Sequence, residues 1–135
     1  MKLITILSVI LVSGGDGDST SVELLYINGS RICSLPDLPS SRVLHTQTGV
    51  TACGGLDGTP ASTTCHTLSS TGSWELSHNL DQSRQEHCAW ASPQGIRLIG
   101  GRDSGAQGTS EILLENGDTS PGFNYPKLYY VTRYV

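Results

Sequence analysis

RLIGG (residues 97–101) ends a short apolar run in a glycine pair, and two earlier stretches do the same. They are ILVSGG (residues 10–15) and VTACGG (residues 50–55). A glycine at the end of a strand fits a backbone with positive φ, or a place where a Cβ would obstruct a neighbour. Because three such stretches occur in 135 residues, we ask whether other residues recur at the same spacing, as they would in a repeat fold.

The glycine pairs begin at Gly14, Gly54 and Gly100, at intervals of 40 and 46 residues. Periods in this range indicate repeat architectures. Other residues recur at a spacing of 42, and the stretch ELLYING (residues 23–29) matches EILLENG (residues 111–117) at a spacing of 88. The pairs at a spacing of 42 are Ser41/Ser83, Arg42/Arg84, His45/His87, Leu38/Leu80 and Ile32/Trp74. The extra residues of the longer interval fall around SPQG (residues 92–95).

Each unit is predicted to contain four short strands, because short β-prone runs alternate with Gly, Pro and Asn-Gly turn residues. In the second unit the predicted strands are residues 45–49, 50–53, 63–68 and 74–77. In the third unit they are residues 87–92, 96–99 and 110–115, with the last near Phe123. No useful helical stripe occurs, so the sequence predicts an all-β protein with almost no helix.

This pattern resembles the kelch repeat. The matching elements are the apolar run into a glycine pair, an aromatic or apolar position further on (Ile32, Trp74 and Phe123), and the Arg-x-x-His step. Three segments resemble the sequences of a divergent, cysteine-containing kelch group in invertebrate proteins: LLYINGSRICSLPDLPSSR, WASPQG and TSEILLENGDTSPGF. The resemblance covers about residues 9–123.

The resemblance implies a partial β-propeller of about two to three four-stranded antiparallel kelch-type blades. The expected blades are residues 9–38, 42–80 and 84–123, followed by a divergent tail at residues 124–135. Kelch rings usually hold more units, and a partial ring leaves apolar faces and strand edges exposed. We therefore expect either a fragment of a longer chain, which we favour, or copies that associate to complete a ring.

The N-terminus has two interpretations. Met1-Lys2 followed by an apolar run has the layout of a signal peptide. The same run leads into the first glycine pair, so residues 1–13 are predicted to be either a signal peptide or the first strand.

The cysteines help to predict the cellular compartment of the protein. Cys53 and Cys65 are expected on neighbouring antiparallel strands of one blade, within bridging distance, although two small buried hydrophobic residues are the alternative. Cys33 and Cys88 are not expected to pair with each other. Asn28 begins an N-glycosylation sequon, or serves only the predicted turn. A disulfide, a signal and a glycan would all belong to a secreted protein, which we favour over a cytoplasmic one.

The histidines and the large aromatic residues are expected to be structural. His45 and His87 occupy equivalent repeat positions, which favours a structural role over metal binding, and Trp74 is expected to pack between blades. The cysteine spacing does not support a zinc ribbon, and we predict no metal ion and no cofactor.

The composition and motifs favour a non-catalytic protein-interaction module. No known catalytic or nucleotide-binding motif stands out. The absence of a basic stripe argues against nucleic acid, and the absence of an 18-residue apolar run argues against membrane insertion. The candidate partner-binding residues are Arg42, Arg84, Arg102 and Asp103.

Three alternatives stay open. Arg42 and Arg84 could instead be buried or lie at the rim and bind main-chain groups. The chain could be a fragment of a carbohydrate-active or oxidase-type propeller enzyme. It could also be a truncated gene product without independent function.

Overall fold

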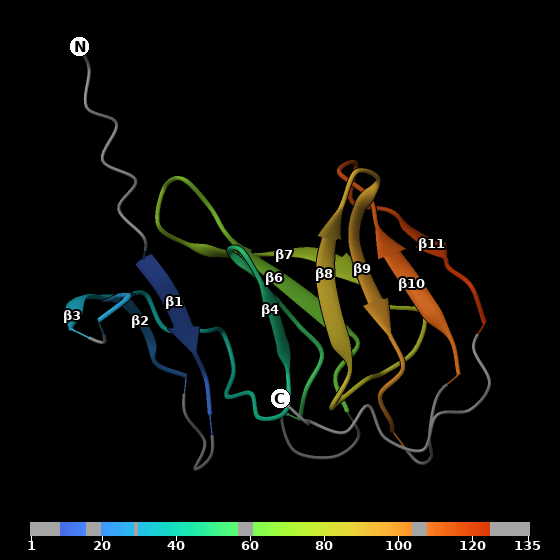
Figure 1. Ribbon diagram of the computed structural model, residues 1–135, viewed down its shortest axis with the longest axis horizontal. Helices are drawn as coiled ribbons and strands as arrows, with labels where there is room; N and C mark the ends of the chain where they lie inside the picture. Colours follow the sequence, from blue (N-terminus) through green and yellow to red (C-terminus); the bar gives the residue numbers. More distant parts are fainter. Residues whose placement is uncertain (1–8, 16–19, 29, 57–60, 104–107, 125–135) are drawn as a thin grey trace.

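The computed structural model describes residues 9–15, 20–28, 30–56, 61–103 and 108–124. Eleven strands form three antiparallel sheets that follow one another along the chain (Figure 1). Sheet I contains β1 (Val9–Ser13), β2 (Val22–Tyr26) and β3 (Arg31–Leu35); sheet II contains β4 (Thr46–Thr48), β5 (Thr51–Cys53), β6 (Thr64–Leu68) and β7 (Trp74–Asn79); sheet III contains β8 (Cys88–Ser92), β9 (Gly95–Ile99), β10 (Ser110–Leu113) and β11 (Thr119–Pro121). These ranges contain no helix, and therefore none that is long and apolar enough to cross a membrane.

Each sheet is a meander in which every strand pairs antiparallel with the next strand along the chain. The turn between the last two strands has the same main-chain hydrogen bond in all three sheets. The N–H of Tyr26, Ser69 or Leu114 donates to the carbonyl four residues later, at 2.8–2.9 Å. The all-β prediction is therefore confirmed at the level of antiparallel sheets, four-stranded in sheets II and III.

The last strand of sheet III differs from the prediction. β11 ends at Pro121, and Phe123 lies beyond it with 72% of its surface exposed. In the strand register Trp74 faces Leu68, and the corresponding pairs are Thr119 with Leu113 and Arg31 with Leu25. The expected equivalence of Trp74 with Ile32 and Phe123 is therefore wrong: the corresponding positions are Arg31, one residue before Ile32, and Thr119, four residues before Phe123.

Trp74 nevertheless contributes to packing between sheets. Its half-buried ring packs against the cluster that joins sheets I and II, and its Nε1–H donates to the carbonyl of Pro36 at 2.8 Å. A tryptophan can lie in this position because one end of its ring is apolar and the other is a hydrogen-bond donor.

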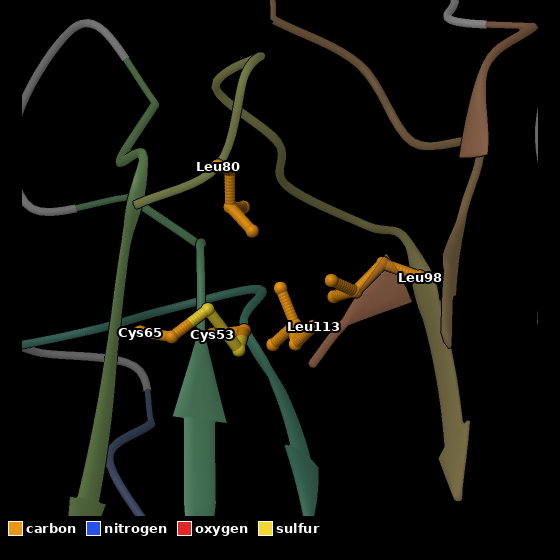
Figure 2. Packing of buried hydrophobic residues seen from close by; sticks show 5 residues of the cluster. All are labelled: Cys53, Cys65, Leu80, Leu98 and Leu113. Carbon is orange, nitrogen blue, oxygen red and sulfur yellow. A yellow bond between two sulfur atoms is a disulfide. The ribbon is translucent and has the colours of Figure 1, made fainter. Parts of the chain in front are cut away.

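The core consists of two layers, each between neighbouring sheets. The layer between sheets I and II contains Val22, Leu38 and Ala52, with Leu11, Leu35 and Trp74 at its edge. The layer between sheets II and III contains Cys53, Cys65, Leu80, Leu98 and Leu113 (Figure 2). Sheet II therefore contributes one face to each layer, and its strand β5 is buried throughout.

Of the six residues by which the second repeat interval exceeds the first, four come from one hairpin. Thr46 pairs with Cys53 in sheet II, seven residues apart, whereas Cys88 pairs with Ile99 in sheet III, eleven residues apart. The four extra residues lengthen the β8–β9 hairpin, whose tip lies at Ser92 and Gly95. The extra length was predicted around residues 92–95, and the structure places it in the two strands that lead to that tip.

Candidate functional site

The glycine pairs lie where consecutive sheets are joined. We call residues 42–45 and 84–87 the linker segments, because the first leads from sheet I to sheet II and the second from sheet II to sheet III. Gly54 has φ +62°, and a Cβ there would lie 2.4 Å from the carbonyl oxygen of Arg84. Gly55 has φ +84°, and a Cβ there would lie 2.6 Å from the carbonyl oxygen of Val43. Both glycines are thus required by the linker segments on their two sides.

One glycine of each other pair meets a linker segment in the same way. A Cβ at Gly14 would lie 2.5 Å from the carbonyl oxygen of Arg42, and one at Gly101 would lie 2.6 Å from that of Gln85. The N–H groups of Gly15 and Gly55 donate to the carbonyls of Arg42 and Arg84, at 3.0 and 2.7 Å. The recurrence of glycine pairs along the chain therefore reflects a recurring contact between sheets.

Arg42 is buried and its side chain binds the next sheet. Nη1 donates to the carbonyls of Gly54 and Thr64, both at 2.9 Å. Nη2 donates to the Thr64 hydroxyl at 2.5 Å and to Nδ1 of His66 at 2.9 Å. The Arg42 carbonyl binds sheet I while its guanidinium binds sheet II, so this residue fastens the two sheets together.

Arg84 repeats this arrangement between sheets II and III. Nη1 donates to the carbonyls of Gly100 and Thr109 at 2.7 and 3.0 Å, and Nη2 donates to the Thr109 hydroxyl at 2.6 Å. Where Arg42 has His66, Arg84 has a carboxylate: its Nε donates to Glu111 Oε1 at 2.9 Å, and both side chains are buried. The second oxygen of Glu111 accepts the N–H of Asp81 at 2.8 Å, so the buried charge is well satisfied.

These contacts correct the expected partner-binding role of two residues. The exposed fractions of Arg42 and Arg84 are 1% and 0%. Their guanidinium groups are used inside the protein and do not reach a partner, which is the alternative that the sequence left open. The acceptors on Thr64, Thr109 and Glu111 were not identified from the sequence, although the ELLYING/EILLENG match already contained Glu111.

The two equivalent histidines, His45 and His87, belong to the same contacts between consecutive sheets, which we call the joints. The His45 ring lies beside Gly14, and the His87 ring lies beside Gly54, each 2.8 Å from the position of a Cβ. Nε2 of His45 hydrogen-bonds the Ser13 hydroxyl at 3.1 Å, and Nε2 of His87 hydrogen-bonds the Thr46 hydroxyl at 2.6 Å.

The surroundings keep these imidazoles neutral. Burial, with the nearby charge of Arg84 and with His45, lowers the pKa of His87 to about 3. Burial and the charge of Arg42 also lower the pKa of His45 and of His66. A neutral His66 has a lone pair on Nδ1, which accepts the hydrogen bond from Arg42.

The linker segments and adjacent loops form one end of the stack, which we call the linker end. Arg102 is 45% exposed there and pairs with Glu86 at 2.9 Å. Asp103 is half-buried: Oδ1 accepts the N–H of Ala61 at 3.3 Å and Oδ2 accepts the Ser83 hydroxyl at 2.7 Å. Of the four candidate partner-binding residues, Arg102 is therefore the one exposed in the structure, while Asp103 holds two loops together.

A strained backbone also recurs at the linker end. Leu44 and Glu86 occupy the same repeat position and have positive φ values of 57° and 54°. The Glu86 N–H donates to the Leu44 carbonyl at 2.9 Å, which links the two linker segments directly. Non-glycine residues with positive φ are uncommon and are held by their surroundings.

Cys53 and Cys65 form a disulfide, as the sequence predicted. They are directly paired residues of β5 and β6, and Figure 2 shows Leu80, Leu98 and Leu113 gathered beside the bridge. Cys33 and Cys88 are free thiols, exposed and half-buried respectively. Asn28 is exposed at the turn after β2, where its side-chain oxygen accepts the N–H of Ser30 at 2.9 Å.

Among the described residues no group of three or more His, Cys, Asp and Glu side chains is arranged to hold a metal ion. The predicted signal segment lies largely outside the described ranges, as does the tail from residue 125 onward.

No protein-family model matches the chain, and no curated protein matches it. The internal repeat is therefore the main basis for a functional proposal.

Proposed function

We propose that the chain is a non-catalytic protein-binding module of the kelch type, in which the three sheets are consecutive units of a partial β-propeller. The observation that carries this proposal is the repeated joint between sheets. An Arg-x-x-His segment fits against a glycine pair and binds corresponding acceptors in both cases. Such a joint supports a rigid stack of units, and rigid repeat stacks offer extended surfaces for partners.

The linker end is the proposed binding surface. The exposed Arg102–Glu86 pair lies there, and Glu86 itself has a positive φ and donates its N–H to the carbonyl of Leu44. Loops held by a rigid scaffold are common binding positions. Because Arg102 is an exposed positive charge at this end, we expect a partner with an acidic group near it.

A charge-reversal pair tests this surface. Affinity capture with the wild-type chain is compared with capture by Arg102→Glu and by the matched control Arg97→Glu, which changes the same charge nearer the β8–β9 tip. A protein partner at the linker end would be lost with Arg102→Glu and kept with Arg97→Glu. A partner retained by both variants, or no partner at all, would contradict the proposal.

Secretion is part of the proposal, supported by the Cys53–Cys65 disulfide and the exposed Asn28. Expression through a secretory route followed by non-reducing peptide mapping tests it. The expected products are a Cys53–Cys65 peptide and a glycan on Asn28. Four alkylatable thiols and an unmodified Asn28 would argue for the cytoplasm.

A further inference from the structure

The turn between β10 and β11 contains an asparagine whose side chain can react with the main chain that follows it. Residues 115–118 are all exposed, and Asn116 is followed by Gly117, which has a positive φ of 91°. A Cβ at Gly117 would meet one described atom within 4 Å, the carbonyl oxygen of Ser77 at 3.6 Å. Neither a side chain nor close packing therefore shields the main-chain nitrogen of Gly117.

The hydrogen bonds of the turn prepare the amide carbon of Asn116 for attack. Oδ1 of Asn116 accepts the N–H of Asp118 at 3.1 Å, and Nδ2 donates to Oδ2 of Asp118 at 2.7 Å. The first bond lies where negative charge develops when a nucleophile adds to the amide carbon. The second places a carboxylate beside the nitrogen that leaves. The side chain is thus folded back over the main chain of the turn, which lowers the entropy cost of an intramolecular attack.

We propose that Asn116 is a site of spontaneous deamidation. The Gly117 nitrogen loses its proton and forms a bond to Cγ of Asn116, and the side-chain nitrogen takes up a proton and leaves as ammonia. The product is a cyclic succinimide, which water opens at either carbonyl group. Opening yields aspartate or isoaspartate at position 116, and isoaspartate has an additional methylene group in the main chain. The reaction needs water as its only co-reactant.

Asn79 provides the contrast within the described part of the chain. It is also exposed, but the next residue is Leu80, which is buried and donates its N–H to the carbonyl of Thr63 at 2.7 Å. Reaction at Asn79 would require Leu80 to leave the core. The Gly117 N–H donates to the Leu114 carbonyl at 3.1 Å within its own turn, so only the turn has to open.

The second Asn-Gly step of the sequence has a competing use. Asn28 is followed by Gly29 and Ser30, which complete a glycosylation sequon, whereas Asp118 at the corresponding place excludes a sequon at Asn116. The amide of Asn116 is therefore not protected by a glycan.

Deamidation would act on the contact between sheets II and III. Nε2 of His78 on β7 donates to the Leu114 carbonyl at 2.7 Å, and the Thr119 hydroxyl donates to the Asn79 carbonyl at 2.9 Å. A new carboxylate at position 116 would stand beside the carboxylate of Asp118, and isoaspartate would lengthen the main chain between these two contacts. Both products are expected to loosen the turn.

The test follows the full chain during prolonged incubation at mildly alkaline pH, where loss of the amide proton is favoured. Peptide mapping by mass spectrometry is expected to show aspartate and isoaspartate at position 116, formed at least about tenfold faster than at Asn79. Ammonia should be released in proportion. The Leu114 amide, which donates to the Asp118 carbonyl, should lose protection from hydrogen exchange in the aged protein.

Two variants serve as controls. Asn116→Gln keeps an amide but would have to form a larger ring, so the products at position 116 should be absent. Glu115→Gln changes an exposed residue of the same turn and leaves the reacting groups in place, so its conversion should match that of the wild-type chain.

Three results would overturn the proposal. Equal conversion at Asn79 and Asn116 would show hydrolysis that does not depend on the turn. Conversion only in denaturing urea would show that the folded turn protects the side chain, and the absence of any conversion would show that Asn116 is inert. The proposal depends on this turn alone, so a failed capture at the linker end would leave it intact.

Discussion

At the scale of single residues, the buried arginines carry the largest electrostatic consequence. Arg84→Met would leave Glu111 charged in the interior, with only one of its partners remaining. We expect a loss of about 3–5 kcal/mol in the free energy of unfolding, measured by urea denaturation.

The control for this prediction is Arg102→Met, which removes an exposed ion pair and should cost less than about 1 kcal/mol. Adding Glu111→Gln to Arg84→Met should recover part of the loss. Equal costs for the two arginine variants would contradict the described role of Arg84.

Gly54 is the second residue whose replacement has a clear structural cost. Gly54→Ala would place a Cβ 2.4 Å from the main-chain oxygen of Arg84 at a backbone with positive φ. We expect a loss of about 2–4 kcal/mol. Gly72→Ala serves as the control, because φ is +85° there but no described atom lies within 4 Å; its cost should be about 1 kcal/mol. The two variants are compared by thermal and urea unfolding.

The histidines make the stability depend on pH. The pKa of His87 is about 3 in the folded protein and about 6.5 in an unfolded chain. Above pH 6.5 the residue is neutral in both states. Between about pH 6.5 and 3 the unfolded chain binds a proton that the folded protein does not, so stability falls as the pH drops.

At pH 5 His87 alone should lower the free energy of unfolding by about 2 kcal/mol relative to pH 7, and the lowered pKa values of His45 and His66 act in the same direction. Urea unfolding at both pH values measures the loss, which should be smaller in His87→Asn. An unchanged loss in that variant would show that other groups cause it.

At the scale of elements, much could be predicted from the sequence. Strand positions follow from local β-prone runs and turn residues, and this is why the hairpins of sheets II and III were predicted. The pairing of Cys53 with Cys65 followed from placing them on neighbouring strands. The last strand was expected near Phe123 because an aromatic residue was taken to mark it, but Thr119 occupies the register position of Trp74 and Phe123 lies beyond β11.

The burial of Arg42 and Arg84 could not be predicted from the sequence in the same way. Half of the acceptors described above are main-chain carbonyls, which leave no signature in the sequence. The charged partner of Arg84, Glu111, lies 27 residues away in the sequence. The sequence therefore marked Arg42 and Arg84 as repeated residues without deciding whether they face a partner or the interior.

The disulfide is the element-scale feature with a measurable contribution. Cys53 and Cys65 are separated by 12 residues, and a crosslink over a loop of this length stabilises by about 3 kcal/mol in the chain-entropy model. We expect Cys53→Ala/Cys65→Ala to lower the free energy of unfolding by about 2–4 kcal/mol, measured with and without reductant. Cys33→Ser should have no effect, since Cys33 is exposed and free. Equal stability of the reduced and oxidised proteins would contradict this.

At the scale of the whole molecule, the three sheets should differ in local stability. Sheet II is covered on both faces, whereas Ile10 and Val12 on sheet I are exposed. In a linear stack each unit is stabilised by its neighbours. Native-state hydrogen exchange should therefore be slowest in β5 and β6 and faster in β1. Uniform exchange across the sheets, or slowest exchange in sheet I, would contradict this description.

The longer β8–β9 hairpin shows how this protein can change in length. Its four additional residues extend two paired strands away from Gly100 and leave the joint at Arg84 equivalent to the joint at Arg42. An even number of inserted residues preserves the alternation of faces, whereas an odd number requires a bulge. The tips of these hairpins are therefore suitable graft points for foreign peptides, because an epitope inserted there in steps of two residues would leave the buried joints unchanged.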